Sequence, residues 1–422
     1  MMLKEINFPK GFFEKNRKKL SKKLPDASVT FVLSSLDKIK NRDTFYRYKQ
    51  DSNYFYLTGL ELKRSVLAIY KYGGRTHEVL FRKVLDPTLE KWVGRNIPLE
   101  DIRKISGISD VRDIRDLDDF YRTVFVSMGM EKVFLYNEFI PDLAVPTYTQ
   151  VFGSNLKNRF NFIKISPLNP LIDPLRRVKE EAEIKMIKRA IDITAAGLND
   201  VLTKISTGIS ENECEGILLY NYLKHGSVQP AFLTISASGS NATVLHYEDN
   251  NKRSSKGDLI LFDTGAEYKN YASDISRTLP VSKKYTPEQK KFYNIVLDAS
   301  KKTKKHAKAG VKLSELQEIT KDVLFRGLFD LKMVKEKKDL MNYYYHGVSH
   351  FMGLDTHDVG NTSEKLPAKS VITVEPGLYI AEKNIGIRLE DDILIKPGGN
   401  TNLSSHIPIE IEEIEDIMNK RK

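Results

Sequence analysis

The sequence contains a single cysteine, Cys214, and a single tryptophan, Trp92, among its 422 residues. One cysteine excludes a disulfide within the chain and a zinc site built from cysteines. No apolar stretch approaches the roughly 18 residues that a membrane-spanning helix needs, and the first residues lack the apolar core of a secretory signal. These absences predict a cytoplasmic protein with no membrane partner.

Acidic residues are too few to balance the basic ones: 67 Lys and Arg against 56 Asp and Glu leave a net charge of +11. A basic chain can bind nucleic acid or an anionic membrane. The excess is mostly lysine, and its densest run, at 15–23, is typical of a solvated helix face. Because no zinc finger, RNA-binding aromatic motif or arginine-rich tract accompanies it, the sequence predicts no nucleic-acid partner.

The length suits two domains better than one. The pattern of the first 170 residues predicts a smaller, mixed α/β domain, and a proline-containing segment at 166–170 ends that pattern. We therefore expect domains over 1–170 and 171–422. The strands expected in the first domain lie at 29–33, 65–71, 76–83, 132–136 and 160–165.

The second domain reads as helix, helix and strands, twice over. The expected elements are helices over 173–202 and 210–226 with strands at 258–263 and 272–280, then helices from 286 and 314 with strands at 370–380 and 385–395. Asp173 is expected to cap the first helix ahead of Pro174, and Ser210 and Ser314 to cap later ones. This order predicts an α+β domain with a central antiparallel sheet and helices on one face.

Four carboxylates lie on these strands at places where apolar residues are expected: Asp263, Asp274, Glu375 and Glu390. A buried carboxylate is costly unless it is paired or binds a metal. One acid at a strand end is usually a cap or turn residue. Four acids in matched pairs, two for each copy of the motif, instead indicate a site.

The histidines cluster as well. His346, His350 and His357 fall within twelve residues, and His246 precedes the first acidic strand. Four acids and one histidine suit two divalent ions that share bridging carboxylates, and oxygen-rich ligation favours a hard ion such as Mn²⁺. A purely structural metal site or a polar strand face remains the alternative at this point.

The order Asp263, Asp274, His350, Glu375, Glu390 resembles the metal set of the pita-bread metallopeptidases, which include methionine aminopeptidase, prolidase and aminopeptidase P. The surrounding strings match too: DTGAEY at 263–268, SDISRT at 273–278, TVEPGLYI at 373–380 and GIRLEDD at 386–392. The segment YKQDSNYFYLTG at 48–59 is similar to the N-terminal domain of aminopeptidase P, which methionine aminopeptidases lack.

The resemblance implies a pita-bread catalytic domain and the activity of a metal-dependent Xaa-Pro aminopeptidase, a cytoplasmic protease of peptides with proline second. A hydroxide that bridges two divalent metal ions, Mn²⁺ by preference, would attack the bond before proline. Prolidase is the alternative. A metal-free binding module of the same fold is a further one, but such proteins lose ligands that this chain keeps.

The same resemblance assigns the roles of the site residues. Asp263, Asp274, His350, Glu375 and Glu390 would bind metal, and Glu375 would also move the proton. His246 and His357 would hold the substrate and stabilise the oxyanion, which makes them catalytic with Glu375. His346 would line the proline side, and Arg388 would orient acids and substrate. The family also implies a homo-oligomer, a dimer or tetramer.

Two positions stand out from this pattern. Asn270 occupies a place where the family often has glycine. Trp92 lies between charged residues, and we expect it to pack in the core of the N-terminal domain. The alternative hypothesis is that Trp92 is exposed and shapes an active site, its own or that of a neighbouring subunit.

Overall fold

The computed structural model describes residues 3, 5–138 and 145–420, which fold into two compact units. One unit comprises Asn7–Arg176, and the other comprises Arg177–Lys422 with Met1–Ile6. Residue 170, where the sequence predicts the domain boundary, lies at the start of the last helix of the first unit, α7 (Asn169–Arg177). Both units mix helices and strands, and the α+β class is confirmed.

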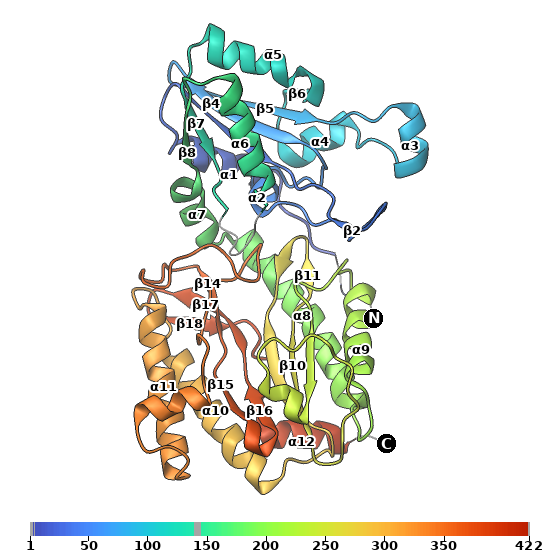
Figure 1. Ribbon diagram of the computed structural model, residues 1–422, viewed down its shortest axis with the longest axis vertical. Coiled ribbons are helices and arrows are strands. Elements are labelled where there is room, and N and C mark those ends of the chain that lie inside the picture. The colour runs from blue at the N-terminus through green and yellow to red at the C-terminus, as the bar shows by residue number, and fades with distance from the viewer. Residues whose placement is uncertain (1–2, 4, 139–144, 421–422) are drawn as a thin grey trace. The chain divides into compact units, whose positions relative to one another are not determined.

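A six-stranded mixed sheet forms the centre of the first unit, in the order β6-β5-β4-β1-β7-β8 (Figure 1). Strands β1, β4 and β5 pair antiparallel, whereas β7 joins β1, β8 joins β7 and β6 joins β5 in parallel. The strands of this sheet are β1 (Ser28–Leu33), β4 (Val66–Tyr72), β5 (Arg75–Arg82), β6 (Val111–Asp113), β7 (Lys132–Leu135) and β8 (Lys164–Pro167), and a separate hairpin has β2 (Ile39–Asn41) and β3 (Thr44–Phe45).

Every residue of β1 is buried, because helices cover both faces of the sheet. On one face Phe31 packs edge-on against Phe120 and Tyr121 in a cluster of aromatic and aliphatic side chains. The helices of this unit besides α7 are α1 (Phe12–Ser21), α2 (Ser52–Thr58), α3 (Pro87–Val93), α4 (Leu99–Ser106), η1 (Ile114–Asp116), α5 (Leu117–Tyr121), η2 (Arg122–Ser127) and α6 (Tyr148–Arg159).

Two expectations for this unit are wrong. The strand expected at 160–165 begins only at Lys164, because Phe160 still closes the end of α6 through a hydrogen bond from its amide to the carbonyl of Leu156. Trp92 does not pack in the core: it lies on α3, a helix with no buried residue, and is 84% exposed.

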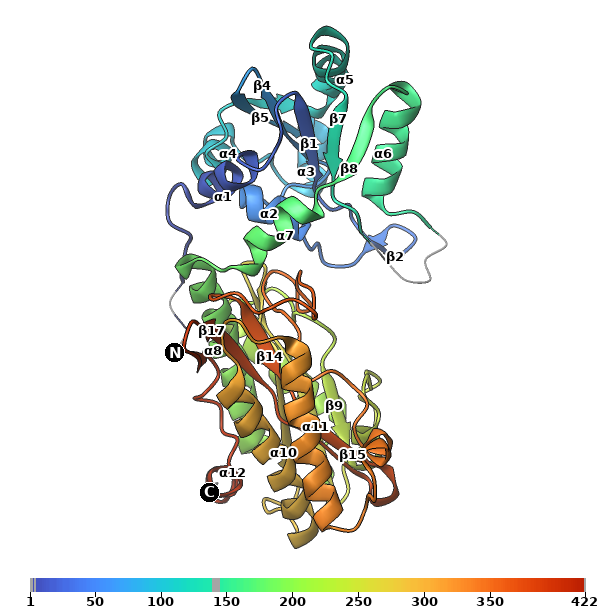
Figure 2. The same ribbon diagram turned by 90° about the vertical axis from the view of Figure 1, so that its left-hand side faces the viewer.

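In the second unit two helix pairs flank the strands, with α8 and α9 beside β10 and with α10 and α11 side by side against β14 (Figures 1 and 2). The helices are α8 (Glu181–Lys204), α9 (Glu211–Lys224), η3 (Gly239–Thr243), α10 (Pro287–His306), α11 (Leu313–Asp330), η4 (Lys337–Asn342), η5 (Ala381–Lys383) and α12 (Ile411–Asn419). Each pair is followed by its own group of antiparallel strands, so the predicted duplication of the architecture is present.

The long strands expected in this unit are interrupted. The observed strands are β9 (Ile235–Ser238), β10 (Leu259–Thr264), β11 (Glu267–Tyr268), β12 (Tyr271–Ala272), β13 (Ile275–Pro280), β14 (Val371–Val374), β15 (Gly377–Ile380), β16 (Ile385–Arg388), β17 (Asp391–Lys396) and β18 (Gly399–Asn402). Three of the breaks contain Asp274, Glu375 and Glu390. Each break releases an acidic residue from strand pairing.

The expected helix over 173–202 is in fact two helices, and Asp173 caps neither of them. Pro174 lies inside α7, and α8 begins afresh with a capping box between Glu180 and Glu183. The chain leaves helical geometry between them because Lys179 is engaged elsewhere. Its amide donates to the carbonyl of Lys369, and its Nζ lies 2.9 Å from a buried Asp358 carboxylate oxygen.

The N-terminal cap of α11 differs from expectation, and the turn at Asn270 shows why asparagine is tolerated there. Helix α11 is capped by Lys312 with Glu315, not by Ser314. Asn270 and Lys269 form the two-residue turn between β11 and β12, with φ of 67° and 47°. Such a turn needs left-handed backbone at both positions, where glycine and asparagine are the most tolerant residues. Asparagine therefore replaces glycine here without changing the turn.

No helix among the described residues combines the length and apolar character needed to cross a membrane.

Cys214 offers a test of the packing between α9 and the strands. Burial raises the pKa of its thiol to about 12. Because the thiolate is the reactive form, we expect iodoacetamide at about pH 8 to modify the native protein at least roughly a hundredfold more slowly than the urea-unfolded chain. Mass spectrometry should count one adduct after unfolding. Equal rates in the two states would contradict the buried position.

Candidate metal centre

Antiparallel pairing brings the four acidic residues together in two pairs. In the first group of strands, Asp263 on β10 pairs with Ser276 on β13, and Asp274 directly precedes β13. In the second group, β14 pairs with β17, with Val374 opposite Asp391. Glu375 follows Val374 and Glu390 precedes Asp391, so the same register extended by one residue brings these two carboxylates side by side.

A serine links the two pairs. The Ser276 hydroxyl donates to Glu390 Oε2 at 2.8 Å, and the Glu390 amide donates to the Ser276 carbonyl at 3.1 Å. The two copies of the strand motif thus meet directly at the acids. This contact explains why residues more than a hundred positions apart in the sequence form one cluster.

His350 completes the cluster. Its Nε2 lies 3.3 Å from Asp274 Oδ2 and 3.6 Å from Glu375 Oε1. Asp274, His350 and Glu390 each offer a ligand atom, and these atoms all lie within 4.8 Å of one another. The Nδ1 of His350 lies 3.0 Å from the Phe351 carbonyl oxygen, so Nδ1 carries the proton and Nε2 keeps the lone pair that can bind a metal.

Asp263 is the fifth predicted ligand and lies beside this group. Its Oδ2 accepts a hydrogen bond from Arg388 at 2.6 Å, and its charge raises the pKa of Asp274. Its Oδ1 is buried and accepts no hydrogen bond from the described residues. A buried carboxylate oxygen without a donor is costly, and a cation at that oxygen would remove the cost.

The pKa shifts of the acidic cluster also favour a bound cation. Burial, followed by repulsion from neighbouring carboxylates, raises the pKa of Asp274 and Glu390 well above the ordinary values. Burial also raises the pKa of Glu375, although His350 and Arg388 oppose the shift. Oxygen donors in excess, one imidazole and uncompensated negative charge form a set that fits divalent cations.

Comparison with known proteins agrees with this geometry. Residues 185–397 match metallopeptidase family M24, and residues 13–133 match the N-terminal domain of aminopeptidase P. The chain is 31% identical to the Xaa-Pro aminopeptidase of Haemophilus influenzae over 97% of this chain and 98% of that protein. The chain belongs to the aminopeptidase P group of metallopeptidase family M24.

Solved structures place the whole chain in the same group. A Bacillus anthracis protein, described as a candidate aminopeptidase P, aligns with a TM-score of 0.95 and 39% identity, covering 97% of this chain and 98% of that one. Escherichia coli aminopeptidase P with the inhibitor Pro-Leu aligns with a TM-score of 0.88 and 30% identity over the same shares. The pita-bread fold is therefore confirmed, and this protein is a metalloaminopeptidase.

Two more of the histidines that the sequence singled out, His346 and His357, lie beside the candidate metal centre. The His346 Nε2 lies 2.9 Å from the Tyr379 hydroxyl, and its Nδ1 lies 3.7 Å from Glu375 Oε2. Burial, followed by the nearby Arg388 charge, lowers the pKa of His346 to about 4, so this imidazole is neutral at neutral pH. The ring of His357 is solvent-exposed and stands edge-on to His350, 4.3 Å between centroids.

His246 is exposed on the segment that joins β9 to β10. Burial is the main cause of the lowered pKa of both His346 and His357, and the charge of a protonated His246 adds a smaller part. Of the four histidines that the sequence singled out, His346 and His350 lie beside acids of the cluster, and His357 contacts the His350 ring.

Arg388 is buried beside the acidic residues of the site. Its guanidinium donates to Asp263, to the Tyr379 hydroxyl at 2.9 Å and to the Ser276 hydroxyl at 3.0 Å. Sequence reasoning assigned Arg388 but missed Tyr379 and Ser276. The signal was present, because both residues lie within the strings that carry the family resemblance.

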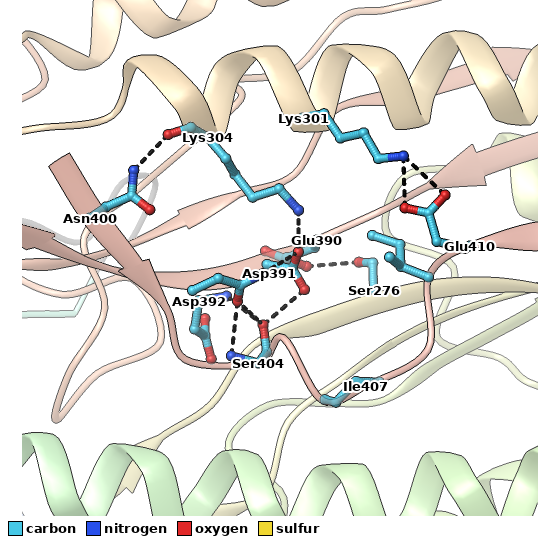
Figure 3. A network of polar contacts seen from close by, with 12 residues as sticks. Ser276, Lys301, Lys304, Glu390, Asp391, Asp392, Asn400, Ser404, Ile407 and Glu410 are labelled. Atoms are coloured by element: carbon cyan, nitrogen blue, oxygen red, sulfur yellow. Dashed lines mark hydrogen bonds and ion pairs between the residues drawn. The ribbon is translucent and has the colours of Figure 1, made fainter. Parts of the chain in front are cut away.

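A second missed group stabilises the strand break at Glu390. The next residue, Asp391, turns to the opposite face and accepts from Lys304 on α10 and from Ser404, whereas Glu390 accepts from Ser276 (Figure 3). Arg277 also bonds Asp391 at 2.8 Å. Burial alone would raise the pKa of Asp391, but the two cations hold it well below the usual range.

Metal removal should reveal the repulsion in this site. Acids whose pKa is raised on folding stabilise the protein at low pH, and that stability is lost as the pH rises above their unfolded values, near 4, through the raised folded values. We therefore expect the chelated protein to melt progressively earlier between about pH 5 and pH 8. Calorimetry should show that the melting-temperature gap to the metal-loaded protein widens over the same range.

The variant Asp274→Asn is the control for this experiment, because it removes one of the repelling charges. Its chelated form should melt several degrees higher than the chelated wild type at about pH 8. A gap between the loaded and chelated wild type that does not change with pH would contradict the interpretation.

Proposed function

We propose that this metalloaminopeptidase releases the first residue of peptides that have proline in second position. The observation that carries the proposal is the convergence of Asp274, Glu375, Glu390 and His350 in a chain that matches metallopeptidase family M24 and, ahead of it, the N-terminal domain of aminopeptidase P. The relatives named Xaa-Pro aminopeptidase, which match this chain over nearly its full length, support it.

We propose that Asp263, Asp274, His350, Glu375 and Glu390 hold two divalent cations, with Mn²⁺ as the preferred metal because most donors are oxygens. When bound, the cations would supply Lewis-acid activation of the scissile carbonyl and of the attacking water. The unpartnered Oδ1 of Asp263 and the raised pKa values of Asp274 and Glu390 support this donor set.

The protein's own groups then handle protons and charge. The bond before proline is a tertiary amide, and, as in any amide, its nitrogen must gain a proton to leave as an amine. Glu375 is proposed to take the proton from the attacking water and to deliver it to that nitrogen. His246 and His357 would hold the substrate and stabilise the oxyanion, and the neutral His346 would line the proline side.

Prolidase is the alternative, and the relatives named Xaa-Pro aminopeptidase favour the aminopeptidase. A prolidase must hold the free carboxylate of a dipeptide and needs a cation beside it. The buried Arg388 guanidinium already donates to Asp263, Tyr379 and Ser276. These bonds use three of its five N–H groups, which supports a role for Arg388 in orienting the acids and leaves two N–H groups for the substrate.

A matched substrate pair tests the activity. With Mn²⁺ present, an Xaa-Pro-Xaa tripeptide should be cleaved and an Xaa-Pro dipeptide should not, and a chelator should abolish the cleavage. Cleavage of the dipeptide alone would assign the enzyme to prolidase. Cleavage of neither peptide by metal-loaded protein would refute the substrate class.

Histidine variants test the oxyanion role. His357→Ala should lower kcat by roughly 10²–10³-fold, the size of effect seen when one oxyanion donor is lost. The matched control is His306→Ala, since His306 is exposed on α10 and its Nδ1 lies 2.8 Å from the Lys302 carbonyl oxygen of the same helix. An unchanged kcat for His357→Ala would contradict the assigned role.

The exposed apolar surface of the N-terminal unit supports a homo-oligomer, a dimer or tetramer, as a further proposal. Trp92 and Val93 on α3 are 84% and 68% exposed. Light scattering on the wild type and on Trp92→Ala should show a smaller assembly for the variant, with an altered dependence on substrate length. A variant unchanged in both respects would rule out Trp92 as a subunit contact.

The cytoplasmic location that the sequence predicts stays a prediction.

A further inference from the structure

The segment 239–252 connects β9 to β10 and carries His246 near its middle. Its first turn, η3, packs closely on β16: a side chain at Gly386 would bring its Cβ within 1.8 Å of the Ala242 carbonyl oxygen. Around His246 the packing is looser: Val244, His246 and Glu248 are exposed, and Leu245 and Tyr247 are only partly buried against an apolar cluster. A polar contact also holds this half of the segment.

Glu211 makes that contact. It is the first residue of α9, its side chain is fully buried, and its carboxylate accepts from five donors of the 238–252 region. Oε1 accepts from the Ser238 amide at 2.6 Å, the Ser238 hydroxyl at 2.7 Å and Asn241 Nδ2 at 3.0 Å. Oε2 accepts from the Tyr247 hydroxyl and the Lys252 amide, both at 2.8 Å.

These donors lie at the beginning, in the middle and at the end of the segment. One carboxylate therefore closes the whole segment onto the N-terminus of a helix, where negative charge is favourable. A buried charge is costly, and here neutral donors satisfy it with charge-assisted hydrogen bonds. A neutral amide could not replace it, because each of the five partners donates.

We propose that Glu211 is a positioning residue for the peptidase reaction: it holds the segment that presents His246 to the site. Tyr247, the neighbour of His246 in the chain, is the link, since its ring packs against a buried cluster and its hydroxyl reaches Glu211. The inference rests on the role proposed above for His246.

A double-mutant cycle in the metal-loaded enzyme tests the proposal. Glu211→Gln should lower kcat at least about tenfold, with a smaller change in KM, because a misplaced catalytic group costs mainly the reactive geometry. In the His246→Ala background the same substitution should change kcat less than about twofold. An equal loss in both backgrounds, or no loss in either, would overturn the proposal.

The control is Glu213→Gln, two residues along the same helix. Glu213 is exposed, its carboxylate accepts from the Ser210 amide in the capping box, where glutamine serves as well, and it forms an exposed ion pair with Arg253 at 3.6 Å. Its kcat should stay within about twofold of the wild type. Should Glu211→Gln fail to fold, Tyr247→Phe removes a single donor and should lower kcat in the same background-dependent way; a kcat equal to that of the wild type would overturn the proposal.

Hydrogen exchange separates a failure of this inference from a failure of the proposed function. In Glu211→Gln the amides of 238–252 should exchange at least about tenfold faster than in the wild type, while α8 exchanges unchanged. This readout needs no substrate. Unchanged exchange in the segment would overturn the proposal, whereas faster exchange in an enzyme that cleaves no Xaa-Pro peptide would support the tether and refute only the assigned substrate.

Discussion

Mutual repulsion among buried carboxylates governs the architecture of the catalytic unit. Asp274, Glu375 and Glu390 lie close together with raised pKa values, and Asp263 adds its charge from the side. Such a group is unstable without cations. The fold accommodates it at breaks in strands, where the side chains are freed from the ladder and the two copies of the motif meet.

The surrounding cations are distributed so that they do not neutralise this group. Lys304 and Arg277 are bound to Asp391, on the opposite face of the strand from Glu390. Lys179 is bound to Asp358, and Arg388 takes only one oxygen of Asp263. Each of these pairs anchors a segment next to the site, and the cluster around His350 is left with the negative charge that a divalent metal requires.

The loop segments of the site are held by buried polar contacts and not by apolar packing alone. The carboxylate of Glu211 gathers the segment that carries His246, and the buried pair of Lys179 and Asp358 holds the segment that follows His350. The carbonyl of Phe351 receives both the His350 ring and the Asp358 amide, so the same segment orients the imidazole. Glu211 is the first residue of α9, whereas Lys179 lies in the break just before α8.

The sequence by itself determined the two-part organisation, the duplicated helix–helix–strand order and the metal-centre candidates. Capping residues such as Ser210, short apolar runs and acids on strands are local signals that can be recognised in the sequence. Only the tertiary structure decided where the long strands break, why α8 starts at Glu181 instead of continuing from Asp173, and that Trp92 is exposed. It also showed the buried contacts of Glu211 and Lys179. Their partners lie far away in the chain, and a hydrogen bond between distant residues leaves no period or spacing in the sequence.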